Sequence, residues 1–141
     1  MRVCLDTNVF VQIFTARSPF VEILEALVHG RLHLLVSNEI LCEYEEIITN
    51  ELGAEQWQRV ERLIETLQQL HGNVLEIEPH YRFGVVKLDP DDNKFTDCAI
   101  AGGAEFVITY DRHFTSLLGS GYRPQPLTPE KLTEMFGRGS S

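Results

Sequence analysis

The chain carries little positive charge and lacks the segments that place proteins in or across membranes. There are 12 lysines and arginines against 21 aspartates and glutamates, which gives a formal net charge of −9. The apolar runs are much shorter than the roughly 20 residues that span a bilayer. Residues 1–6 also lack the apolar region of a secretory signal. These absences predict a cytoplasmic protein with no membrane partner.

Several common catalytic and metal-binding patterns are missing as well. The three cysteines, Cys4, Cys42 and Cys98, have no metal-ligand spacing, and we expect buried free thiols. The sequence contains no glycine-rich phosphate loop of the Walker or dinucleotide type. It also contains no signature of a serine or cysteine nucleophile. Any chemistry must therefore come from another type of residue.

Alternating apolar patterns predict an α/β protein. Strands are expected at 3–5, 32–36, 74–77 and 106–109, with an edge strand at 122–127. Helices are expected at about 18–29, 37–52, 55–71, from Asp91 or Asp92 to 101, and from 128 onward, with a loop at 79–90. This order indicates a three-layer α/β/α sandwich around a parallel sheet of four to five strands. We predict a single domain over residues 1–136 and a flexible tail over 137–141.

Two acidic residues follow strands that are expected to lie parallel in this sheet. Asp6 comes directly after the first strand, and Asp111 comes shortly after the fourth. The carboxyl ends of parallel strands meet at one edge, which is where open α/β sheets bind ligands. Clustered carboxylates repel one another unless a proton or a cation intervenes. Mg²⁺ or Mn²⁺ suits such oxygen ligands, so the pattern predicts a metal-dependent enzyme acting on phosphoryl groups.

Three further acids come from two predicted helices. Glu43 lies at the border of the apolar face of helix 37–52, where it could lean towards the sheet edge or be an ordinary boundary glutamate. Asp92 and Asp97 lie near the start of the next helix and could share one metal or bind two. Asp92 could instead cap the helix. That explanation does not extend to Asp97, which lies inside the helix.

Neutral polar residues accompany the acids that follow the strands. Thr7 could bond a carboxylate or a phosphate, and Asn8 could orient Asp6 or a metal-bound water. Thr109 could play the same part beside Asp111. The alternatives are that Asn8 is a turn residue and that Asp111 is a helix cap. We take the three neutral residues as supporting members of the predicted site.

Positively charged groups near these acids are few. Lys94, Arg112 and His113 could contact a phosphate, but solvated surface positions are the preferred interpretation. Negative net charge alone argues against nucleic-acid binding, because phosphate contacts use lysine and arginine. Divalent ions would neutralise the acidic cluster and attract phosphate, so a nucleic-acid substrate stays possible. No residue can be assigned to substrate binding from the sequence.

With these residues assembled, the chain resembles the PIN-domain family of metal-dependent ribonucleases. Four segments carry the resemblance in order, at 5–9, 39–43, 89–97 and 109–112. The similarity is greatest to the branch of VapC-like toxins from toxin–antitoxin pairs. It implies a parallel sheet flanked by helices, an acidic pocket that binds Mg²⁺ or Mn²⁺, and hydrolysis of RNA. It also implies a homodimer and inhibition by a small antitoxin protein.

The resemblance also implies roles for individual residues. Asp6, Glu43 and Asp111 match the family's acids, and the remaining acid is either Asp92 or Asp97. Asn93 stands at a position where some relatives carry aspartate. The expected catalytic and metal-binding residues are Asp6, Glu43, Asp92, Asp97 and Asp111.

The predicted reaction is endonucleolytic cleavage of RNA that leaves 5′-phosphate and 3′-hydroxyl ends, with a metal lowering the pKa of an attacking water. Two alternatives remain. A haloacid-dehalogenase-like phosphatase also places an aspartate after the first strand, but it needs a second one where this chain has Asn8. A catalytically silent PIN-like module would use the acidic pocket for a structural metal and act by binding a partner.

Overall fold

The computed structural model describes residues 1–79, 82–86 and 92–139. Residues 80–81, 87–91 and 140–141 lie outside this described part, and with them half of the predicted loop and the start of segment 89–97. The strands are β1 (Arg2–Leu5), β2 (His33–Val36), β3 (Val74–Glu76), β4 (Phe106–Ile108) and β5 (Gln125–Leu127). The helices are α1 (Thr7–Ile13), α2 (Val21–Val28), α3 (Asn38–Leu52), α4 (Ala54–Leu70), α5 (Asn93–Gly102) and α6 (Pro129–Gly139), with a 3₁₀ helix η2 (Arg112–Leu117).

The five strands form one sheet in the order β3-β2-β1-β4-β5, and every neighbouring pair is parallel. The chain therefore moves outward from β1 to β2 and β3, and then returns to the other side of β1 for β4 and β5. Connections diverge at the carboxyl ends of β1 and β4, which creates the crevice where open α/β sheets bind ligands. The predicted α/β architecture with a parallel sheet is confirmed.

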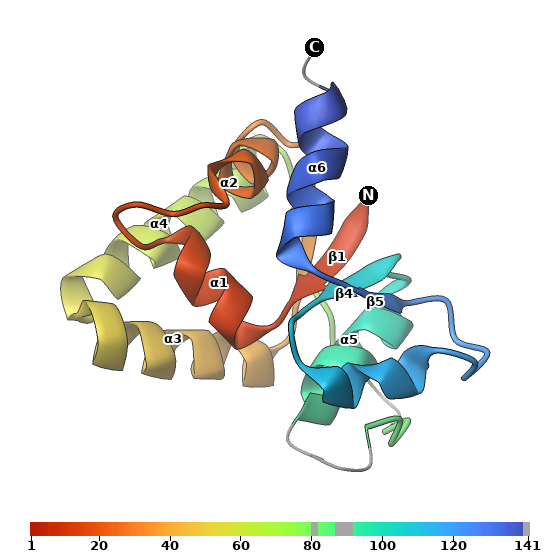
Figure 1. Cartoon of the computed structure of the whole chain (residues 1–141). Helices are drawn as coiled ribbons and strands as arrows, with labels where there is room; N and C mark the ends of the chain where they lie inside the picture. Colours follow the sequence, from red (N-terminus) through yellow and green to blue (C-terminus); the bar gives the residue numbers. More distant parts are fainter. Residues whose placement is uncertain (80–81, 87–91, 140–141) are drawn as a thin grey trace.

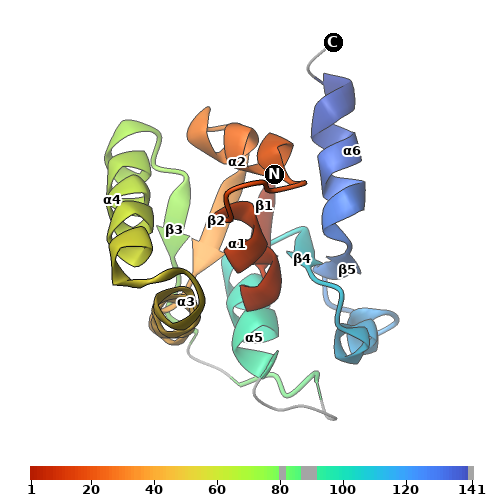
Figure 2. The ribbon, with the colours of Figure 1, turned by 60° about the vertical axis from the view of Figure 1, so that its left-hand side comes forward.

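Helices cover both faces of this sheet. In Figure 1, α1 and α5 lie on opposite sides of β1. Helix α5 packs against β1, β2 and β4, whereas α2 packs against α1 and α6. Figure 2 shows the paired helices α3 and α4 beside the β3 edge and α6 beyond the β5 edge. Within the described residues, no helix combines the length and the apolar character that crossing a bilayer requires.

The helical boundaries differ from the sequence-based expectation at both ends of the chain. Helix α1 was not predicted; it begins directly after β1, where the Asp6 carboxylate caps it by accepting from the Thr7 N–H. Its run of β-branched and aromatic residues has little intrinsic helix propensity, so packing against α3 has to stabilise it. Ser18 does not cap α2 but bonds the Phe20 N–H in the preceding turn. At the other end, α6 continues to Gly139, beyond residue 136 where the domain was expected to end.

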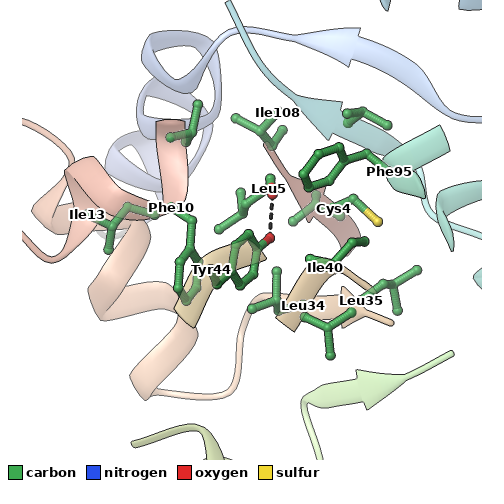
Figure 3. Packing of buried hydrophobic residues seen from close by; sticks show 14 of the residues in the cluster. Cys4, Leu5, Phe10, Ile13, Leu34, Leu35, Ile40, Tyr44, Phe95 and Ile108 are labelled. Atoms are coloured by element: carbon green, nitrogen blue, oxygen red, sulfur yellow. Dashed lines mark hydrogen bonds between the residues drawn. The ribbon is translucent and has the colours of Figure 1, made fainter. Parts of the chain in front are cut away.

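A buried tyrosine fastens α3 to the end of β1. The Tyr44 ring stacks on Phe10 with centroids 3.8 Å apart, and its hydroxyl donates to the Leu5 carbonyl (Figure 3). Leu5 immediately precedes Asp6, and Tyr44 immediately follows Glu43. The same core contacts therefore set the positions of two predicted site residues.

The cysteines are divided between the core and the surface. Cys4 on β1 and Cys98 on α5 are buried and interact, and burial raises the pKa of the Cys4 thiol. Cys42 is exposed. The prediction of a buried thiol is therefore wrong for Cys42, because its helical position turns it to the solvent side of α3.

Candidate active site

Asp6 is held at the end of β1 by hydrogen bonds to its backbone and to both carboxylate oxygens. Its N–H donates to the Ile108 carbonyl of β4 at 2.9 Å. Carboxylate Oδ1 accepts from the Thr7 N–H at 2.8 Å, and Oδ2 accepts from the Thr109 hydroxyl at 2.7 Å. The residue is only 9% exposed. These contacts give the carboxylate one orientation at the crevice between β1 and β4.

Thr109 connects the two acids that follow the strands. Its hydroxyl donates to Asp6, and the same oxygen accepts from the Asp111 N–H at 2.9 Å. Thr109 is buried, at 4% exposure. Thr109 thus lies beside Asp111, where it was expected. Its side chain contacts both acids and orients them.

Replacing Thr109 with valine should destabilise the protein, because it leaves the Asp111 N–H and one Asp6 oxygen without this partner. We expect a loss of about 1–3 kcal/mol in the free energy of unfolding, measured by urea denaturation. Thr109→Ser keeps the hydroxyl and should retain most of the stability. Thr66→Val removes an exposed hydroxyl on α4 and should change stability by less than about 0.5 kcal/mol. A Thr109→Val loss as small as that of Thr66→Val would contradict the proposed linkage.

Negative charges crowd around Asp6. Burial raises the pKa of the Asp6 carboxyl above its usual range, and the bonds from Thr109 and Thr7 oppose that rise. The charges of Asp111 and Glu43 raise the pKa further. Asp6, which follows β1, is thus influenced by the charges of Glu43 on α3 and of Asp111, which follows β4.

Glu43 points to this crowded edge and already has a positive partner. Its carboxylate accepts from the Thr7 hydroxyl, and Oε1 lies 2.9 Å from the Lys94 ammonium. Lys94 belongs to α5, so the ion pair links α5 to α3. Lys94 was expected on the solvated surface, but its side chain is only 15% exposed, and it instead offsets one charge of the cluster.

Asp92, Asp111 and His113 form a compact group of possible metal ligands. One side-chain atom from each lies within 4.8 Å of the others. The His113 Nδ1 atom is 3.2 Å from Asp111 Oδ1 and 3.8 Å from Asp92 Oδ2. Asp92 precedes α5 without capping it through its side chain, so the capping interpretation does not explain this residue.

His113 was not predicted as a site residue, because a surface position was preferred for it. Asp111 caps η2 by accepting from the His113 N–H at 2.9 Å, so both alternatives considered for Asp111, cap and site residue, apply together. An aspartate cap brings the residue two positions later back to its own carboxylate. The two-residue spacing of Asp111 and His113 was therefore the feature of the sequence that could have indicated His113 as a site residue.

Asp97 lies in different surroundings from Asp92. Its carboxylate accepts from the Phe83 N–H at 3.0 Å. Burial raises the pKa of its carboxyl, the Phe83 bond and the Arg82 charge oppose the rise, and Glu39 adds to it. Two helical residues that are five positions apart, such as Asp92 and Asp97, point in directions that differ by about 140° around the helix axis. Asp97 and Asp92 consequently belong to different polar environments.

Two hollows border the acidic edge. The first, which we call the acidic hollow, has a volume of about 470 Å³ and is lined by Asp6, Asn8, Tyr110 and Asp111, among others. The second, of about 300 Å³, is lined by Ser37, Glu39, Arg82, Lys94 and Asp97, among others. Asn93 lines it too, and its amide bonds both backbone groups of Val86. Asn8 is thus at the acidic hollow, whereas Asp97 is not among its lining residues.

The donor set suits a divalent cation. Carboxylates from Asp92 and Asp111 supply hard oxygen ligands, and the His113 imidazole supplies a nitrogen. Burial, followed by the charges of Asp111 and Glu43, raises the pKa of Asp6, and a cation beside Asp111 would offset part of this negative charge.

A family model described as PIN domain matches residues 2–113. The matched region runs from β1 to His113 and includes every residue of the site described above. A search of curated proteins finds no match.

Proposed function

Because the chain belongs to the PIN-domain family, whose members are generally nucleases, we propose that it is a metal-dependent endoribonuclease. The observation that carries the proposal is geometric: possible metal ligands from Asp92, Asp111 and His113 lie within 4.8 Å of one another. The Thr109 hydroxyl joins Asp111 to the buried Asp6 carboxylate beside them. Carboxylates that repel one another at this edge of the sheet are stabilised if a cation binds among them, and the bound cation can in turn attract a phosphate.

The chain's own residues would divide the work as follows. Asp6, Asp92, Asp111 and His113 would hold Mg²⁺ or Mn²⁺, which supplies a more acidic water and neutralises charge on the scissile phosphate. Thr109 and the Thr7 N–H hold the Asp6 carboxylate in its orientation. Asn8 lines the same hollow and could bond a phosphate oxygen or a water.

Glu43 and Asp97 receive different roles in this proposal. Glu43 holds the Lys94 ammonium beside the acids, where it offers a positive charge to the substrate. Asp97 holds the Phe83 N–H and so positions residues 82–86 next to the site. Of the two acids that the sequence could not separate, we therefore propose Asp92 as the main metal ligand.

One observation favours the second candidate, a catalytically silent PIN-like binding module. The Lys94–Glu43 ion pair already offsets one acid of the site, which weakens its demand for a metal. Nothing comparable favours the haloacid-dehalogenase-like phosphatase, since the family match points elsewhere and Asn8 stands where that class needs an aspartate.

We also propose that the protein acts in the cytoplasm as the toxin of a toxin–antitoxin pair, as a homodimer inhibited by a small antitoxin protein. The support is the resemblance of its four segments to VapC-like toxins. Co-purification with the product of the neighbouring gene, followed by loss of RNA cleavage in the complex, tests this part. Cleavage that is insensitive to that product would remove it and leave the nuclease assignment intact.

The central test is incubation of the purified protein with single-stranded and structured RNA in Mg²⁺ or Mn²⁺. We expect internal cleavage with 5′-phosphate and 3′-hydroxyl ends, identified by mass spectrometry of the fragments. Single-stranded DNA of the same sequence tests the choice of nucleic acid. Metal binding without cleavage under any of these conditions would favour the silent module, and a covalent aspartyl-phosphate would favour the phosphatase.

A further inference from the structure

A third hollow adjoins the acidic hollow and shares two of its lining residues. This tyrosine hollow has a volume of about 460 Å³ and is lined by Gln12, Pro19, Phe20, Tyr110, Glu130 and Thr133. Gln12 and Tyr110 line both hollows. Glu130 and Thr133 lie on α6, beyond the residues that the family model matches. A ligand seated in the acidic hollow could therefore extend past Tyr110 into this neighbouring space.

Tyr110 is held in place while its ring stays accessible. Directly after β4, Thr109 turns inward to Asp6, and Tyr110 turns outward, as alternation along an extended chain requires. Its hydroxyl donates to Glu130 of α6, yet the residue is 49% exposed. Fixing an aromatic ring before a ligand arrives reduces the entropy that binding would cost.

From this arrangement we propose that the Tyr110 ring stacks on the base of the RNA nucleotide beside the scissile phosphate. This inference rests on the proposed nuclease function and names a substrate-binding residue for it. Stacking on aromatic side chains is a common way to hold single-stranded RNA, because every base has a π-face. The phosphate would lie in the acidic hollow and the adjoining base in the tyrosine hollow.

The charges around Tyr110 favour a base over a phosphate in the tyrosine hollow. Glu130 lines it, and Asp6 and Asp111 line the adjoining acidic hollow. A second phosphate would be repelled by these carboxylates, whereas a neutral base would not. Bases also carry amino groups that donate hydrogen bonds. A carboxylate accepts several such bonds, so Glu130 can hold Tyr110 and still receive one from a base.

The apolar and amide groups of the tyrosine hollow complete the match. Pro19 and Phe20 provide an apolar side for a flat ring, and Phe20 is itself firmly buried at 5% exposure. The Gln12 amide, next to both hollows, can donate and accept hydrogen bonds to a base edge. The tyrosine hollow thus combines a stacking face with polar groups at its rim.

Binding measurements on a cleavage-deficient background test the proposal. The probe is a fluorescently labelled single-stranded RNA whose cut site has been mapped with the wild-type protein. Affinity is measured by fluorescence anisotropy with Asp6→Asn protein, alone and combined with Tyr110→Ala, Tyr110→Leu or Tyr110→Phe. Two further RNAs carry an abasic ribose in place of the nucleotide on one or the other side of the cut site. Combined with the tyrosine variants, they complete a double-substitution cycle.

We expect Tyr110→Ala and Tyr110→Leu to weaken binding roughly 5- to 150-fold, whereas Tyr110→Phe should restore most of the affinity. The abasic ribose on one side of the cut should cause a similar loss with the tyrosine and little further loss without it. Met135→Ala removes an exposed apolar side chain on α6 outside both hollows and should leave affinity unchanged. Thermal unfolding of each variant shows whether it is folded, and Tyr110→Leu keeps apolar bulk if alanine is not tolerated.

Two results would overturn the inference while leaving the nuclease assignment standing. One is an unchanged RNA affinity in Tyr110→Leu. The other is independence of the two substitutions, in which the combined loss of affinity equals the product of the losses caused by the tyrosine substitution and by the abasic ribose separately. A change of oligomeric state in Tyr110→Leu without a change in RNA affinity would assign the ring to a contact between copies instead. If the wild-type protein cleaves no RNA under any metal condition, the proposed function and this inference both fall.

Discussion

Asparagine in place of Asp6 should reduce RNA cleavage by roughly 10³-fold or more and, in metal-free buffer at neutral pH, make the protein more stable. The first effect follows because the substitution removes one of the carboxylates that we propose to hold the metal. The second follows because the Asp6 carboxylate is buried beside Asp111 and Glu43, which raises its pKa. An amide avoids that cost: its oxygen can still accept from the Thr7 N–H, and its NH₂ group can donate to the Thr109 hydroxyl oxygen.

The pH dependence of the stability difference has a definite sign. The folded protein holds the Asp6 proton more tightly than the unfolded chain, because the folded pKa is raised from its ordinary value of 3.8. Wild-type stability therefore falls as pH rises from that value through the folded pKa, and the penalty is complete above it. Asparagine has no such titration. The advantage of Asp6→Asn should be full at neutral pH and vanish as the pH falls below about 4.

Thermal unfolding and a cleavage assay on the same preparations measure the two effects. Each kcal/mol gained corresponds to a rise of about 3–5 °C in Tm for a chain of this size. Glu45→Gln, which neutralises an exposed acid on α3, is the matched control and should alter neither property. Wild-type cleavage by Asp6→Asn would remove Asp6 from the mechanism. A lower Tm at neutral pH would show that the carboxylate is needed for folding rather than strained by it.

Chelation of divalent cations with EDTA should stop cleavage, and Mn²⁺ should restore it better than Mg²⁺. The preference follows from the imidazole of His113 beside Asp92 and Asp111, because nitrogen ligands favour transition metals over Mg²⁺. His113→Asp replaces that nitrogen with a carboxylate oxygen. We expect this variant to narrow or reverse the ratio of Mn²⁺-supported to Mg²⁺-supported rates.

Metal binding can also be measured without substrate. A cation that binds only the folded protein stabilises it by about 2.7 kcal/mol at 100 times its Kd, so Mn²⁺ should raise the wild-type Tm. Asp111→Asn should lose most of that rise. His29→Asp, an exposed histidine at the end of α2, is the control for the metal preference and should behave as wild type. Undiminished cleavage in excess EDTA, or equal metal preference in His113→Asp and wild type, would refute the metal assignment.

The strand-end acids show how much of the site could be inferred from residue order. Apolar runs predicted the strands, and a parallel sheet necessarily brings Asp6 and Asp111 to one edge. Caps and breaks such as Ser37 and Gly53 placed α3 and α4 correctly. These features are local or follow from sheet geometry, so they can be read without coordinates.

The arrangement of the surrounding side chains depended on contacts between distant segments. The sequence alone determined the sheet class and the strand-end acids, since apolar periodicity and parallel topology specify them. Only the tertiary structure decided that α1 forms, that Lys94 reaches Glu43, and that His113 joins Asp92. Periodicity sets the angle between residues on one helix but not the rotation of that helix against the sheet. That rotation comes from long-range packing, and it separates Asp92 from Asp97.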